Sequence, residues 1–171
     1  MVEYKEVNIK MTTRALVITS GGFDPIHEGH IEYLQKAKQL YDNVTLVCIV
    51  NTDDFLMKKK GYAFQPLEVR FTILSELKSV DYVVPSIDKD MTVCETIEAV
   101  YNFFTDRNRI EYGFDIIVFA KGGDRTKDEI PEKVICDKLG IVIKDGLGDK
   151  ISSSSELVKR IREIESKKVL K

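Results

Sequence analysis

Short runs of β-branched and aliphatic residues recur along the chain, and longer segments with apolar residues three or four apart separate them. The runs predict strands over Ala15–Ser20, Val44–Val50, Val80–Val84, Asp115–Ala120 and Gly140–Lys144. The spacing between them predicts helices over His30–Tyr41, Pro66–Lys78, Thr92–Thr105, Glu129–Leu139 and Ser153–Lys168. This alternation is typical of a parallel sheet covered by helices. We therefore expect an α/β fold, a Rossmann-like three-layer sandwich with a five-stranded parallel sheet.

The chain has the length and composition of one globular domain. It has 171 residues, and no linker rich in proline, glycine or serine divides it. We expect a single domain over residues 1–171, with residues 1–13 as a peripheral extension. The formal net charge of -2 provides no overall field that would attract nucleic acid or anionic lipid. Any site for an anion must therefore be local.

The cysteines and the hydropathy pattern indicate an intracellular protein. The three cysteines are far apart and lack the close pairing of a zinc site or a redox dithiol, so we expect reduced core thiols at Cys48, Cys94 and Cys136. No segment approaches the roughly 20 apolar residues of a membrane span, and the first residues lack the apolar core of a signal peptide. We expect a cytoplasmic protein without membrane or nucleic-acid partners.

The loop after the first predicted strand carries the most informative residues. In open parallel sheets, ligands bind beyond the carboxyl ends of the strands, which is where this loop lies. Paired glycines allow a close approach to a ligand, and the following helix offers free amides to phosphate. The only two histidines of the chain stand three residues apart at the helix start, where both rings could face one cleft. The loop contains Gly21, Gly22, Phe23, Asp24, His27, Gly29 and His30.

The residues alone leave three interpretations of the histidine pair open. The rings could be surface caps of the helix, or ligands of an incomplete metal site, or donors to a phosphate. Neither the phosphate-loop pattern ending in Gly-Lys-Ser/Thr nor Gly-x-Gly-x-x-Gly is present, which excludes the common kinase and dehydrogenase signatures. If the pair binds a nucleotide, the fold must belong to a different class of nucleotide-binding proteins.

The sequence His27-x-Gly29-His30 resembles the His-x-Gly-His signature of the cytidylyltransferase-like nucleotidylyltransferase superfamily. The resemblance extends over about residues 14 to 162 and is strongest to the adenylyltransferase domain of heptose 1-phosphate enzymes and to glycerol-phosphate cytidylyltransferases. It implies that His27 and His30 stabilise the α-phosphate of a nucleoside triphosphate. The loop residues Gly21, Gly22, Phe23, Asp24 and Gly29 would bind the same nucleotide.

The resemblance also assigns roles to residues after the second predicted strand. It implies that a lysine of the Lys58–Lys60 cluster and Arg70 contact phosphates, with Lys60 and Arg70 completing the catalytic set. Asn51, Asp53, Lys58 and Arg70 would bind the acceptor. A solvated basic loop is the alternative for the lysines.

Two later loops match the same family. The sequence Lys121-Gly122-Gly123-Asp124-Arg125 resembles the heptose enzymes, and implies nucleotide contacts from Lys121, Gly122 and Asp124 and an acceptor contact from Arg125. Serine hydroxyls and helix-start amides would bind nucleotide phosphates in the segment Ile151, Ser152, Ser153, Ser154 and Ser155. A plain turn and a flexible or capping serine run are the alternatives.

The expected activity is transfer of a nucleoside monophosphate from ATP or CTP to a phosphorylated small molecule, a sugar or polyol phosphate, with release of pyrophosphate. Mg²⁺ is expected to arrive with the triphosphate, without a metal site in the protein itself. The alternatives are an adenylyltransferase of the nicotinate mononucleotide or phosphopantetheine type, and a nucleotide sensor without turnover. A homodimer is expected from the resemblance.

Overall fold

The computed structural model describes residues 12–106, 113–122, 130–148 and 153–169. Within these ranges five strands form one sheet, and each neighbouring pair is parallel. The strands are β1 (Arg14–Gly21), β2 (Asn43–Val50), β3 (Tyr82–Pro85), β4 (Ile116–Ala120) and β5 (Val142–Lys144). Their order across the sheet is β3-β2-β1-β4-β5, the doubly wound arrangement of Rossmann-like folds. The predicted fold class is confirmed.

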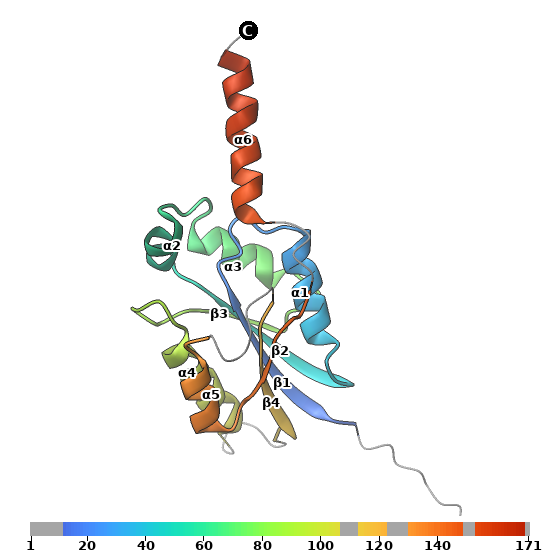
Figure 1. Cartoon of the computed structure of the whole chain (residues 1–171). Coiled ribbons are helices and arrows are strands. Elements are labelled where there is room, and N and C mark those ends of the chain that lie inside the picture. Colours follow the sequence, from blue (N-terminus) through green and yellow to red (C-terminus); the bar gives the residue numbers. More distant parts are fainter. Residues whose placement is uncertain (1–11, 107–112, 123–129, 149–152, 170–171) are drawn as a thin grey trace, which may run out of the picture.

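Helices cover both faces of the sheet (Figure 1). Helices α1 and α3 pack on one face, and α4 and α5 pack on the other. The helices of the described residues are α1 (Glu28–Lys38), α2 (Asp53–Lys60), α3 (Leu67–Ser75), α4 (Cys94–Thr105), α5 (Lys133–Leu139) and α6 (Ser154–Val169).

The central strand β1 contributes to both cores. Ala15 and Val17 pack with α1 and α3, whereas Leu16 and Ile18 pack with α4 and α5. Successive side chains of a strand point to opposite faces, so a strand that is covered on both sides is apolar over most of its length. This explains the uninterrupted apolar run that predicted the strand.

Several predicted element boundaries move by a few residues. β3 begins at Tyr82 instead of Val80, because the Val80 amide donates to the Leu77 carbonyl and not to the sheet. β5 begins at Val142 instead of Gly140, because Gly140 adopts a left-handed φ of 68° as the C-cap of α5. The predicted start of α5 at Glu129 lies outside the described residues.

Helix α2 was not predicted. Its sequence is dominated by charged residues, and Leu56 is its buried residue, so the apolar periodicity is weak. The capping signals are nevertheless present. Thr52 accepts a hydrogen bond from the Phe55 amide at the N-terminus, and Gly61 closes the helix with a left-handed φ of 81°.

The predicted aromatic stretch after residue 92 forms a core helix. Phe104 of α4 is buried, and Tyr101 packs against the same core, while Phe103 is half exposed. Residues 107–112, which include Arg107, Arg109 and Tyr112, lie outside the described residues.

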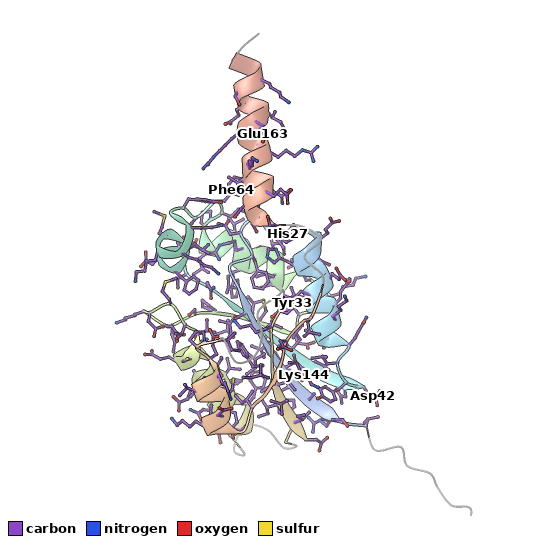
Figure 2. All side chains as sticks on the ribbon, viewed as in Figure 1. His27, Tyr33, Asp42, Phe64, Lys144 and Glu163 are labelled. Atoms are coloured by element: carbon purple, nitrogen blue, oxygen red, sulfur yellow. The ribbon has the colours of Figure 1, made fainter. Side chains whose placement is uncertain are left out.

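Helix α6 projects from the body of the molecule and begins beside the loop that leads into α1 (Figure 1). Figure 2 shows His27 near the base of α6 and Asp42 at the opposite end of the sheet. No helix among the described residues combines the length and apolar character that a bilayer crossing requires.

Candidate active site

A pocket of about 530 Å³ opens at the carboxyl ends of β1 and β4. The chain leaves β1 toward β2 on one side, and β4 lies on the other side, so the pocket occupies the point where the strand order reverses. Ligands of doubly wound sheets bind at this point. The predicted residues that line it are Gly21, Gly22, Phe23, Asp24, His27, Gly29, His30, Lys60, Lys121, Gly122, Ser153, Ser154 and Ser155.

The Gly21-Gly22 pair is required by close packing at the end of β1. A Cβ on Gly21 would lie 2.9 Å from the Phe23 ring, and a Cβ on Gly22 would lie 2.8 Å from the Leu56 side chain. Phe23 is almost fully buried and adopts a positive φ of 50°. The loop therefore turns sharply and brings its backbone to the floor of the pocket.

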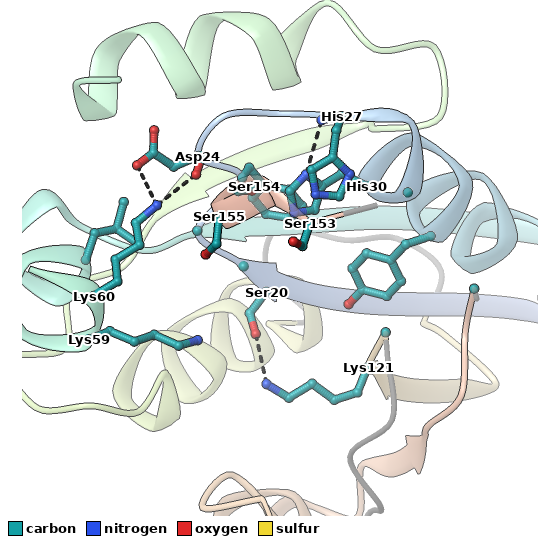
Figure 3. Close-up of a pocket in the computed structure, with 18 of the residues that line it drawn as sticks. Ser20, Asp24, His27, His30, Lys59, Lys60, Lys121, Ser153, Ser154 and Ser155 are labelled. Carbon is teal, nitrogen blue, oxygen red and sulfur yellow. Dashed lines mark hydrogen bonds and ion pairs between the residues drawn. The ribbon is translucent and has the colours of Figure 1, made fainter. Parts of the chain in front are cut away.

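Asp24 holds this loop against the segment that follows α2. Its carboxylate is fully buried and accepts hydrogen bonds from the Phe64 and Gln65 amides, both at 2.7 Å. The Lys60 ammonium lies 2.9 Å from the same carboxylate and 2.8 Å from the Asp24 carbonyl (Figure 3). Asp24 thus fixes the position of Lys60 at the pocket wall.

The two histidine rings stack at the N-terminus of α1, with centroids 3.7 Å apart. His27 is the N-cap, and its backbone amide donates to Nδ1 of His30 at 3.3 Å (Figure 3). Burial, together with the charges of His27 and Lys60, lowers the pKa of His30 to about 3. Burial also lowers the pKa of His27, partly offset by Glu28.

These shifts keep both imidazoles neutral at physiological pH. Because Nδ1 of His30 accepts a hydrogen bond, its ring proton resides on Nε2. His30 can then donate one N–H without carrying a charge of its own. The N-terminal end of the α1 dipole adds partial positive charge at the same place.

The lysines of α2 point in different directions. Lys59 and Lys60 line the pocket, and Figure 3 shows both side chains at one wall. Lys58 donates to the carbonyl of Lys89 at 3.2 Å and does not line the pocket. The geometry therefore favours Lys59 and Lys60 as phosphate contacts over Lys58.

Arg70 lies behind the glycine loop and outside the pocket lining. It is 1% exposed, and its guanidinium donates to the carbonyls of Gln65, Gly22 and Asn51 and to the carboxylate of Asp53, at 2.6 to 2.9 Å. In this geometry Arg70 joins the ends of β1 and β2. Contacts of Asn51, Asp53 and Arg70 with phosphate or acceptor stay predictions.

The start of α6 closes another side of the pocket. Ser154 donates to the Pro25 carbonyl at 2.9 Å, which ties the helix to the histidine loop, and the Ser153 hydroxyl accepts from the Glu156 amide at 3.2 Å. The N-termini of α1 and α6 thus meet at one pocket, an arrangement that suits an anion. Four predicted site residues lie outside the described residues: Asp124, Arg125, Ile151 and Ser152.

Comparison with known proteins agrees with this geometry. The family model described as cytidylyltransferase-like matches residues 18–163. The chain belongs to the cytidylyltransferase-like family. The predicted resemblance is confirmed, and membership supports a transferase of the nucleotidylyl class.

Individual relatives cover this cytidylyltransferase-like chain to different extents. It is 33% identical over 153 residues to the bifunctional protein HldE of Alcanivorax borkumensis, a match covering 86% of this chain and 28% of HldE. It is 36% identical over 101 residues to glycerol-3-phosphate cytidylyltransferase of Bacillus subtilis, covering 59% of this chain and 77% of that enzyme. In HldE of Actinobacillus pleuropneumoniae the match spans 16% of the protein, so the chain corresponds to a minor part of HldE.

A solved structure shares the fold of this cytidylyltransferase-like chain. The lipopolysaccharide core biosynthesis protein of Thermoplasma volcanium GSS1 is 28% identical and superposes with a TM-score of 0.57. The match covers 83% of this chain and the whole of that one.

Five described pocket residues of this cytidylyltransferase-like chain were not predicted from the sequence: Ser20, Tyr33, Leu56, Leu147 and Gly148. Tyr33 lies three residues after His30, on the same face of α1, so helical spacing could have identified it. Leu147 and Gly148 follow β5, and the rule that sites form at strand carboxyl ends could have included them. Leu56 lies in the helix that the weak periodicity concealed.

Proposed function

We propose that this chain transfers a nucleoside monophosphate from ATP or CTP to a sugar phosphate or polyol phosphate. An oxygen of the acceptor phosphate attacks the α-phosphorus and forms a new phosphorus–oxygen bond. The bond from the α-phosphorus to the bridging oxygen breaks, and pyrophosphate leaves with that electron pair. The substrate is the Mg²⁺ complex of the triphosphate, and the acceptor needs no general base because its oxygen already carries negative charge.

One observation carries this proposal: the neutral His30 ring stands at the N-terminus of α1 in a pocket that is also lined by Lys59, Lys60 and Lys121. Among the lining residues that the structure describes, Asp24 is the carboxylate, and its charge faces Lys60. These described residues carry an excess of positive charge that suits a triphosphate. The N–H of His30 would stabilise the charge that develops on the α-phosphate.

The choice of acceptor rests on the relatives. Glycerol-3-phosphate cytidylyltransferase names a polyol phosphate, and the Lys121-Gly122 loop resembles that of the heptose enzymes. Glycerol 3-phosphate and a heptose phosphate are both small phosphorylated molecules with more than one hydroxyl group. The pocket volume of about 530 Å³ is in the range of small-molecule sites.

Pyrophosphate release tests the proposal. The protein would be incubated with Mg²⁺ and either ATP or CTP, together with sugar 1-phosphates, glycerol 3-phosphate, nicotinate mononucleotide or phosphopantetheine. We expect release that depends on a sugar or polyol phosphate. Release with nicotinate mononucleotide or phosphopantetheine alone would favour the coenzyme branch, and tight nucleotide binding without release would favour a sensor.

A further inference from the structure

Glu132 is a buried carboxylate that lies close to the pocket residue Lys121. It stands at the start of α5, it is 4% exposed, and its Oε2 has no hydrogen-bond partner among the described residues. The Lys121 ammonium lies 3.6 Å from this oxygen. Glu132 itself does not line the pocket, whereas Lys121 does.

Several polar groups near Glu132 are poor partners for its charge. Burial and then the charge of Glu132 raise the pKa of the Cys136 thiol to about 12, while burial is the main cause that raises the pKa of Cys94. Burial is also the main cause that raises the pKa of Tyr33, and its hydroxyl donates to the Ala120 carbonyl. These groups stay neutral. Within the described residues, Lys121 is a cation that lies within ion-pair distance of the carboxylate.

The Lys121 ammonium is held from more than one direction. Its Nζ lies 3.3 Å from the hydroxyl of Ser20, at the end of β1 (Figure 3). It also lies 5.0 Å from the centre of the buried Phe119 ring. The side chain therefore crosses from β4 to β1 at the point where the strand order reverses. A buried carboxylate strongly disfavours loss of its counter-charge, so Lys121 cannot swing freely into solvent.

We propose that Glu132 is a positioning residue that holds the Lys121 ammonium at the β1–β4 end of the pocket, where it donates to an oxygen of the bound substrates. This inference rests on the proposed function, because the substrates are those of nucleotidyl transfer. Glu132 touches neither substrate. It acts through Lys121, by fixing the place of the ammonium and keeping it protonated.

Turnover in a set of paired variants tests the inference. Glu132→Gln keeps the shape of the side chain and removes its charge, and we expect it to lower kcat/KM by about 10- to 100-fold, the range for one hydrogen bond to a charged group. In a Lys121→Met background the same change should cost nothing further. Glu98→Gln, which breaks the exposed pair with Lys138, is the matched control and should leave turnover unchanged.

Full activity of Glu132→Gln, or an additional loss in the Lys121→Met background, would overturn the inference. Should Glu132→Gln fail to fold, Glu132→Asp retains the charge at a greater distance. We expect it to reduce turnover less than Lys121→Met does and to have no effect in that background. Here too, an added loss would show that the role is structural.

A second readout does not depend on turnover. Lysine labelled with ¹³C at Cε reports the pKa of each ammonium by NMR, and Lys121→Met identifies the signal of Lys121. Removal of a charge at this distance should lower the pKa of Lys121 by about one unit in Glu132→Gln. An unchanged pKa would overturn the inference. If the wild type shows no pyrophosphate release, the proposed function fails, yet this titration still decides the role of Glu132.

Discussion

The histidine pair shows how local packing gives two residues their chemistry. His27 caps α1, its amide donates to His30, and burial holds the His30 ring neutral with its proton on Nε2. A neutral donor does not need to lose a proton or rearrange as charge builds on a phosphate. The helix amides beside it act in the same direction. The two histidines and the helix terminus therefore form a fixed electrostatic site.

His30→Ala should retain the fold and lose at least about 100-fold in kcat, the effect of removing one oxyanion-type donor. Steady-state pyrophosphate release and circular dichroism would measure the two properties. Gln35→Ala, an exposed residue of the same helix, is the control and should behave as the wild type. A His30→Ala protein with nearly normal turnover would contradict the role of His30.

The stability of the protein should also depend on His30 as the pH falls. The pKa of the ring is about 3 in the folded state and near 6.5 in the unfolded state, so the unfolded state binds more protons between these values. Folding stability attributable to His30 is therefore lost as the pH falls below 6.5. From pH 7 to pH 5, the wild type should lose about 1–2 kcal/mol more unfolding free energy than His30→Gln. Urea denaturation at both pH values measures this, and equal losses would contradict it.

At the scale of elements, the parallel strands were predictable and the short charged helix was not. Strands buried on both faces are apolar over most of their length, and this leaves a clear signal in segments such as Val44–Val50. Helix α2 buries little and is stabilised by its caps, so its periodicity is faint. The direction of each lysine on it depends on where the helix lies relative to Asp24, and no spacing rule gives that.

Alanine variants of the three consecutive lysines of α2 form a matched series that tests which of them contact the substrate. Lys60→Ala and Lys59→Ala should each lower kcat/KM by about tenfold or more, because each removes a cation that lines the pocket. Lys58→Ala should change it by less than about twofold, since its side chain bonds to the Lys89 carbonyl. The same pyrophosphate assay measures all three. Equal effects at the three positions would show that the orientation of α2 in the active protein is different.

At the scale of the whole molecule, the sheet order brings distant segments to one pocket. The loop after β1, the end of β4 and the start of α6 are far apart in sequence, yet all line it. This convergence was predictable from the rule that parallel sheets bind ligands beyond the carboxyl ends of their strands. The burial of Arg70 among carbonyl oxygens was not predictable, because a sequence motif gives the residue type and not the direction of its side chain.

The resemblance predicts a homodimer. Light scattering coupled to size exclusion should therefore give twice the 19.5 kDa of one chain. The measurement needs no variant and is independent of turnover. A mass of one chain at micromolar concentration would contradict the predicted dimer and would not affect the roles proposed for the pocket residues.

Nucleotidyl transfer is best tested by following the α-phosphorus of the triphosphate. With Mg²⁺, the preferred triphosphate and the acceptor found by screening, ³¹P NMR would follow each phosphorus of the reaction. If the chain transfers a nucleoside monophosphate, pyrophosphate and a diphosphate-linked product of the nucleoside monophosphate and the acceptor should form in equal amounts, and His30→Ala should slow both together. Formation of a nucleoside diphosphate with inorganic phosphate or a doubly phosphorylated acceptor would contradict nucleotidyl transfer in this pocket.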